Sequence, residues 1–162
     1  MTTETMPAVG QPAPAFTLPT VGGQSIALAD YQGKQAVVLY FYPADDTPGC
    51  TKEACSFRDL GSQFAEAGAA ILGVSPDPVD SHAKFAGKYS LNFPLLADTD
   101  KAVAKAYGAW GEKTSYGKTS QGILRTTFVI DRKGIIQKVF PKVKVDQHGD
   151  EVLAAVRGLA VG

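Results

Sequence analysis

The chain has 162 residues and a net charge of zero, because 16 Lys and Arg balance 16 Asp and Glu. This length fits one domain with its own core, and the balanced charge argues against nucleic acid or an anionic membrane as the main partner. The N-terminus lacks a basic and apolar signal segment, and no apolar run is long enough to span a bilayer, so a cytoplasmic location is expected.

Apolar runs, helical periodicity and turn residues alternate along the chain. In chain order they predict strands at 16–18, 25–28 and 36–42, a helix at 50–67, a strand at 69–74, helices at 79–89 and 101–107, a strand hairpin at 126–130 and 135–140, and a helix at 151–159. This order favours a mixed β-sheet with helices on both faces, an α/β domain of the thioredoxin-like fold. Residues 9–162 are expected to form this single domain, and residues 1–8 a flexible tail.

The two cysteines of the chain, Cys50 and Cys55, lie where a predicted strand gives way to a helix. A thiol at the N-terminus of a helix ionises readily and is then a nucleophile. This layout is typical of a redox catalyst that oxidises one sulfur and then closes a disulfide with the other. The alternatives are that Cys50 is a small buried core residue and that Cys55 is a buried helix residue. The four-residue gap does not match the two-residue gap of common metal sites.

The segment before Cys50 contains three residues that suit an anion-binding site: Pro43, Thr47 and Gly49. Gly49 lets the chain turn sharply, and the free amides of the first helical turn point toward any anion there. The Thr47 hydroxyl is suited either to capping the helix or to facing the sulfur, and both roles remain open. Pro43 ends the strand and adds an apolar wall, although by itself it indicates only the end of a strand.

The spacing Pro43-x-x-x-Thr47-x-x-Cys50 resembles the active-site signature of the peroxiredoxins. The longer run over residues 40–58 is similar to the peroxiredoxin Q group, also called bacterioferritin comigratory proteins. Further blocks that resemble this group lie at residues 10–18, 93–98 and 122–131. The resemblance therefore covers almost the whole chain from Val9 onward.

The resemblance implies a peroxidase mechanism. The Cys50 thiolate attacks the terminal peroxide oxygen and becomes a sulfenic acid, and Cys55 is the resolving thiol. Only the resemblance assigns Arg125 to the active site. Without it, Arg125 would be interpreted as a solvated residue at the start of a strand. A guanidinium suits this chemistry because its rigid fork of donors can hold both sulfur and peroxide. Thr47 and the amides of Gly49 and Cys50 would stabilise the transition state.

The spacing of the two cysteines has a geometric consequence. A five-residue step along an intact helix puts the Cα atoms roughly 8–9 Å apart and on different faces. A disulfide needs a Cα separation below about 7 Å. We therefore expect the first turns of this helix to unwind when Cys50 and Cys55 form a bond.

Three aromatic residues, Tyr42, Trp110 and Tyr116, are candidates for an apolar rim that accepts organic hydroperoxides. Tyr42 and Trp110 are predicted to bind substrate together with Gly49. Aromatic packing in the core is the alternative for at least one of the three.

The remaining polar residues carry no functional prediction. His82 and His148 are isolated, and neither has the spacing that would form a zinc site with the cysteines. Asp45 and Asp46 are expected to lie in a solvated turn.

The sequence thus predicts a thiol-dependent peroxidase that reduces hydrogen peroxide and organic hydroperoxides and forms its disulfide within one chain. The resemblance implies that thioredoxin reduces it again. No metal, haem or flavin is expected, and a monomer suffices. Two alternatives remain: a thiol–disulfide oxidoreductase, which usually has two residues between its cysteines, and a peroxide sensor that reacts once rather than turning over.

Overall fold

The computed structural model describes residues 6–115, 117–141 and 143–159. Its main feature is a seven-stranded mixed sheet with the strand order β2-β1-β5-β4-β3-β8-β9, and strands β6 and β7 form a separate hairpin. The strands are β1 (Thr17–Thr20), β2 (Gln24–Ala27), β3 (Ala36–Phe41), β4 (Ala69–Ser75), β5 (Leu95–Ala97), β6 (Trp110–Ser115), β7 (Lys118–Ile123), β8 (Thr126–Ile130) and β9 (Ile136–Phe140). The helices are the 3-10 helix η1 (Leu28–Tyr31) and α1 (Pro48–Asp59), α2 (Gly61–Glu66), α3 (Val79–Tyr89), α4 (Ala102–Ala106) and α5 (His148–Leu159).

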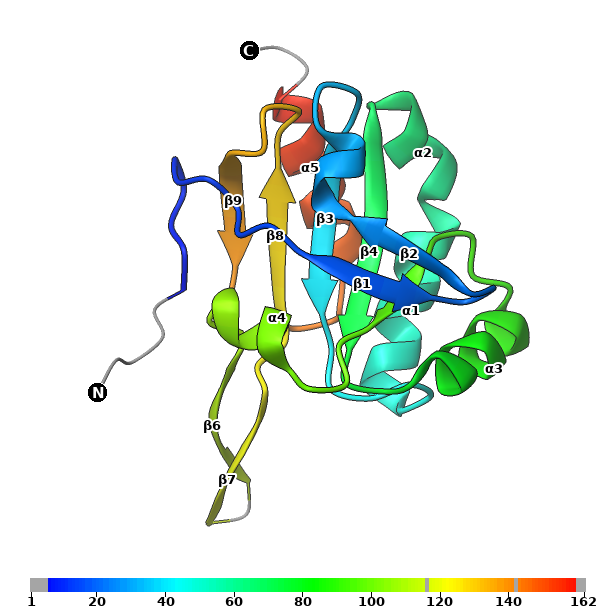
Figure 1. The fold of residues 1–162 in the computed structure, drawn as a ribbon, viewed down its shortest axis with the longest axis vertical. Helices are drawn as coiled ribbons and strands as arrows, with labels where there is room; N and C mark the ends of the chain where they lie inside the picture. Colours follow the sequence, from blue (N-terminus) through cyan, green and yellow to red (C-terminus); the bar gives the residue numbers. More distant parts are fainter. Residues whose placement is uncertain (1–5, 116, 142, 160–162) are drawn as a thin grey trace.

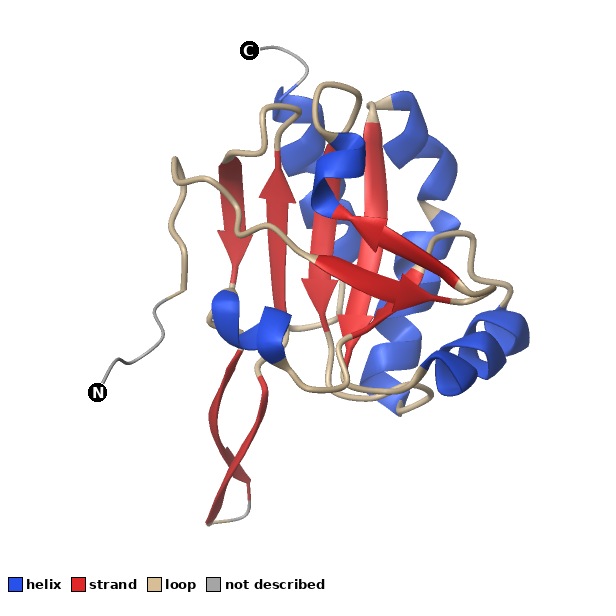
Figure 2. Cartoon of the chain, in the orientation of Figure 1, coloured by secondary structure: helices blue, strands red, loops and turns tan. Residues whose placement is uncertain are grey.

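Helices cover both faces of this sheet, as the sequence predicts. Strand β3 is buried along its whole length, and its side chains alternate between two apolar clusters. Val38 and Tyr40 pack with α1, α2 and α5, whereas Leu39 and Phe41 pack with α4 and β1. In Figure 1, α1, α2 and α5 lie behind the sheet, α4 lies in front of it, and the β1–β2 end of the sheet crosses in front of β3 and β4. Figure 2 shows the same three layers by secondary structure.

The helix predicted at residues 50–67 is two helices, and it begins earlier than expected. Proline is favoured in the first turn of a helix, and α1 starts at Pro48. The chain then leaves helical geometry at Leu60 (φ −96°, ψ 5°) before α2 begins. A Cβ on Gly61 would lie 2.8 Å from the Asn92 side-chain nitrogen, so a larger residue at this break would displace the Asn92 side chain.

Strand β5 and the β6–β7 hairpin were not predicted, and α5 begins at His148 rather than at residue 151. β5 has only three residues, and its extended form depends on parallel pairing with β4, where Val74 lies opposite Leu96. None of the helices in the ranges that the structure describes combines the length and apolar character that a membrane span requires.

Strand register brings distant parts of the chain to one end of the sheet. β3 and β8 are antiparallel, and Phe41 at the end of β3 lies opposite Thr126 at the start of β8. Arg125 precedes β8 directly, and the segment leading to Cys50 follows β3. The register therefore places the arginine beside the start of α1.

Candidate active site

Cys50 lies in the first turn of α1 and is 1 % exposed. Arg125 Nη2 donates to the Cys50 sulfur over 3.3 Å. A Cβ on Gly49 would lie 3.2 Å from the same nitrogen, so the glycine leaves room for the guanidinium. Cys55 is half-buried in the same helix, and both cysteines are free thiols. The structure thus brings Cys50, Gly49 and Arg125 together with the helix unbroken between the cysteines.

Thr47 occupies the N-cap position of α1 with an extended backbone, but its side chain makes no capping bond. Its hydroxyl instead donates to the carbonyl oxygen of Ala44 over 3.1 Å. Of the two roles that the sequence left open, side-chain capping is therefore absent here. Pro43 is half-buried in the loop between β3 and α1.

Glu53 is a member of the site that the sequence interpretation missed. It lies three residues after Cys50, so both side chains fall on the same face of α1. Glu53 is 1 % exposed, and its Oε1 accepts a 2.7 Å hydrogen bond from Arg125 Nη1. Burial raises the pKa of Glu53 to about 7, although the Arg125 guanidinium opposes this shift. The spacing Cys-x-x-Glu was the available signal, but only the fold shows that the carboxylate is buried.

The raised pKa of Glu53 predicts a pH-dependent stability. Between pH 4.5, the ordinary pKa of a Glu side chain, and about pH 7, the pKa of Glu53 in the folded chain, the folded state binds more protons than the unfolded state. The free energy of unfolding should therefore fall as the pH rises through this window. Relative to Glu53→Gln, we expect the parent to lose up to about 3 kcal/mol between pH 5 and pH 8, measured by urea unfolding. Glu66→Gln, at an exposed position of α2, is the control and should keep the parent's pH dependence. Parallel pH curves for the parent and Glu53→Gln would contradict the assignment.

Arg125→Lys should slow the oxidation of Cys50 by peroxide far more than it lowers stability. Lysine keeps the charge but loses the fork that contacts Cys50 and Glu53 together. A loss of about 1–3 kcal/mol in the transition state corresponds to a rate roughly 5- to 150-fold lower. Stopped-flow kinetics measures this rate, and Arg132→Lys in the exposed β8–β9 turn is the matched control. A rate within a factor of two of the parent would place Arg125 outside the reaction.

The three aromatic candidates have different surroundings. Tyr42 is 1 % exposed, stacks on Tyr40 at 5.4 Å and donates its hydroxyl to Asp45 over 2.6 Å. It therefore packs in the core, which was the alternative to a rim, and offers no open surface to a substrate. Trp110 is half-buried at the start of β6, and its ring faces the ammonium groups of two lysines of the α4 region. Tyr116 lies outside the described residues.

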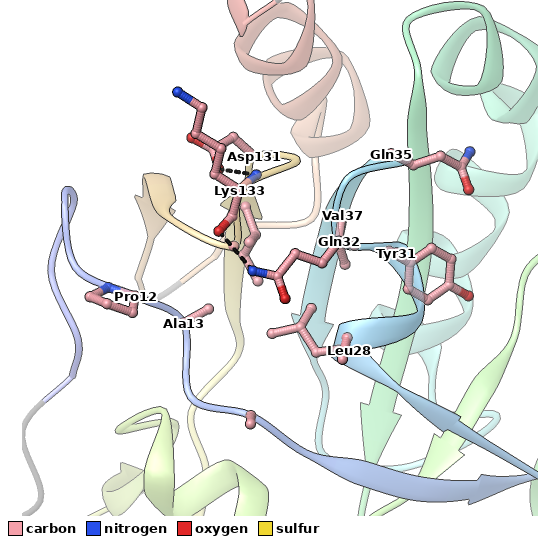
Figure 3. Close-up of a pocket in the computed structure, with 13 residues that line it drawn as sticks. Pro12, Ala13, Leu28, Tyr31, Gln32, Gln35, Val37, Asp131 and Lys133 are labelled. Carbon is pink, nitrogen blue, oxygen red and sulfur yellow. Dashed lines mark hydrogen bonds between the residues drawn. The ribbon is translucent and has the colours of Figure 1, made fainter.

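A cavity of about 150 Å³ lies far from Cys50, at the other end of the sheet. Figure 3 shows it between the N-terminal segment, η1 and the β8–β9 turn, with Leu28 and Tyr31 on one side and Pro12 on another. Val37 and Ile130 line it from the ends of β3 and β8 that are remote from Arg125. It is therefore separate from the candidate active site.

Both histidines are buried. His148 Nε2 lies 2.8 Å from the Thr127 hydroxyl, and burial together with the Arg125 charge lowers the His148 pKa to about 4. His148 is therefore neutral near pH 7, and its ring packs edge-on against Phe57 of α1. The expected solvated turn is wrong for Asp45, whose side chain is 4 % exposed and lies 2.8 Å from His82.

The fold and this site together define a class of protein. A thioredoxin-like sheet that holds a cysteine at a helix N-terminus beside an arginine is the architecture of a thiol-based redox enzyme. The model of the AhpC/TSA family matches residues 9–139 of the chain. A putative peroxiredoxin bcp of Coxiella burnetii is 55% identical over 145 residues, which are 90% of this chain and 95% of that protein. The peroxiredoxin Bcp of Escherichia coli is 46% identical over 144 residues, which are 89% and 92% of the two chains.

Solved structures agree with these relatives. The bacterioferritin comigratory protein of Xanthomonas campestris, described for its alkyl peroxide reduction activity, has a TM-score of 0.84 and 42% identity, covering 90% of this chain and 92% of that one. A PrxQ variant of Xylella fastidiosa has a TM-score of 0.89 and 38% identity, covering 96% and 98%. The chain therefore belongs to the AhpC/TSA family, within its Bcp and peroxiredoxin Q branch, and is a thiol-dependent peroxidase. The family and fold that the sequence predicted are confirmed.

Proposed function

We propose that Cys50 is the peroxidatic nucleophile and that Cys55 of the same chain resolves it. The observation that carries this assignment is the 3.3 Å contact from Arg125 Nη2 to the Cys50 sulfur. The guanidinium donates to the sulfur and has further donors for a peroxide oxygen. Thr47 and the amides of Gly49 and Cys50 stabilise the charge that develops on the departing oxygen.

The reaction balances with two thiols and one peroxide. The Cys50 thiolate takes the terminal oxygen of ROOH, the O–O bond breaks, and RO⁻ leaves and is protonated to ROH. Cys50 is then a sulfenic acid. The Cys55 thiolate attacks its sulfur, the S–O bond breaks, hydroxide leaves as water, and a disulfide forms. A dithiol reductant supplies two electrons and two protons to restore both thiols.

Three finer features belong to the same proposal. The reductant is thioredoxin, in accord with the family resemblance. The enzyme works as a monomer, because both cysteines lie in α1 and no second subunit is needed. Organic hydroperoxides are substrates along with hydrogen peroxide, and the described alkyl peroxide reduction of the Xanthomonas relative supports this. Residues 9–162 correspond to the single domain of a cytoplasmic enzyme; of the tail predicted at residues 1–8, residues 1–5 lie outside the described residues.

Peroxide consumption coupled to thioredoxin, thioredoxin reductase and NADPH tests this function. Hydrogen peroxide and an alkyl hydroperoxide should each be consumed over many equivalents per enzyme, and consumption should stop when thioredoxin is omitted. A single equivalent with thioredoxin present would favour the peroxide sensor. Turnover with glutathione and glutaredoxin but not with thioredoxin would show that thioredoxin is not the reductant. The peroxidase assignment would still hold.

A further inference from the structure

The loop between β3 and α1 is held by a buried polar network centred on Asp45. The Asp45 carboxylate accepts hydrogen bonds from the hydroxyls of Tyr42, over 2.6 Å, and Ser81, over 2.7 Å. It also lies 2.8 Å from Nδ1 of His82 in α3. The Asp45 backbone amide donates to Asp77 over 2.6 Å. One loop residue is therefore connected both to α3 and to the segment that follows β4.

The His82 ring is held by polar partners on both of its nitrogen atoms. The ring is 0 % exposed, and its Nε2 lies 2.9 Å from the carbonyl oxygen of Leu96, which can only accept a hydrogen bond. On the other side, Nδ1 faces the Asp45 carboxylate. Burial raises the pKa of Asp45, but the hydrogen bonds from His82, Tyr42 and Ser81 outweigh burial and lower it below its usual value. His82 and Asp45 therefore form a buried hydrogen-bonded pair, in which the ring is held between the Asp45 carboxylate and the Leu96 carbonyl oxygen.

This pair lies next to the residues that surround the peroxide in the proposed function. The Thr47 hydroxyl takes its direction from Ala44, the neighbour of Asp45. Asp46 has a left-handed backbone (φ 57°), and its carboxylate binds Lys88 and Tyr89 at the other end of α3. Exposed contacts such as Lys88–Asp46 contribute little, so the buried Asp45–His82 pair supplies the fixed point of the loop.

We propose that Asp45 and His82 act together as a positioning pair, which holds the loop from Pro43 to Thr47 against α3 so that Thr47 stays aligned with a peroxide bound at Cys50. This inference rests on the proposed role of Cys50. Among the described residues, no hydrogen bond or ion pair joins the pair to Cys50 or Arg125, so it acts on the geometry of the peroxide rather than on the thiolate. It also fixes the boundary of the conformational change: α1 unwinds after oxidation, whereas the loop before it stays in place.

The test compares two reactions of Cys50 in Asp45→Asn, His82→Gln and the double variant. Oxidation by hydrogen peroxide depends on Thr47, whereas alkylation by iodoacetamide depends on the thiolate alone. Each single variant should lower the rate constant for oxidation by about 10- to 100-fold, as small misplacements of reacting groups do. The rate of alkylation should stay within about twofold of the parent. Asp80→Asn, an equal charge change at an exposed position of α3, is the control and should match the parent in both reactions.

The double variant separates a pair from two independent residues. Each single variant leaves one buried polar side chain without its native partner, whereas the double variant replaces both members of the pair. The double variant therefore also tests whether a single variant acts only by lowering stability. Its oxidation rate should be no lower than that of the slower single variant. Single variants that oxidise at the parent rate, an equal fall in oxidation and alkylation, or effects that multiply in the double variant would each overturn the proposal. A parent enzyme that consumes no peroxide would instead refute the proposed function.

Discussion

Replacing Cys50 by serine is expected to reduce peroxide turnover to the uncatalysed background while the fold remains intact. The hydroxyl fills nearly the same buried volume, but near neutral pH it provides no anion to attack the O–O bond. A buried hydroxyl in place of a thiol costs about 1–3 kcal/mol at most, which urea unfolding measures. The coupled thioredoxin assay measures the loss of turnover.

Cys55→Ser is the matched control, since the same substitution is made one and a half turns further along α1. This variant should consume one equivalent of peroxide, stop as a Cys50 sulfenic acid and over-oxidise unless an external thiol rescues it. Mass spectrometry distinguishes these products. Parent-like turnover in Cys50→Ser would remove Cys50 from the mechanism, and parent-like turnover in Cys55→Ser would remove Cys55.

Oxidation to the disulfide should unwind α1 and expose part of the core. The helix is intact in this structure, so its two cysteines are too far apart to bond without local unwinding. Phe57 follows Cys55 by two residues, is fully buried and packs on Tyr40 at 4.9 Å and His148 at 5.9 Å. Unwinding that reaches Phe57 breaks these contacts and exposes apolar surface, which a dithiol protein can recognise.

Hydrogen exchange on reduced and oxidised protein measures this change. Amides of α1 should lose protection on oxidation, whereas α2 beyond the break at Leu60 and the whole of α3 should keep it. Peroxide-treated Cys55→Ser, which forms no disulfide, is the control and should keep α1 protected. Equal protection of α1 in the reduced and disulfide forms, with the intrachain bond confirmed by mass, would contradict the expected unwinding. A disulfide between two chains would contradict the monomeric mechanism as well.

Local patterns in the sequence were sufficient for most of the fold. The apolar runs of β3 and β8 and the helical period of α3 appear in the sequence close to their observed bounds. Cys50 at the junction of a strand and a helix is also a local pattern, and the resemblance to peroxiredoxins added Arg125. These features were predictable because they depend on neighbours within a few residues, which the sequence shows directly.

Contacts between distant residues were decided by the tertiary structure alone. The antiparallel register that pairs Phe41 with Thr126 brings Arg125 to Cys50, 75 positions away in the chain. Glu53 is buried in the folded chain, and this burial raises its pKa even though Arg125 opposes the rise. Asp45 and His82 looked like a solvated turn and an isolated histidine until α3 packed against the loop and removed water from both. Sequence patterns record local conformation, whereas burial and the pairing of remote charges depend on strand register and helix packing.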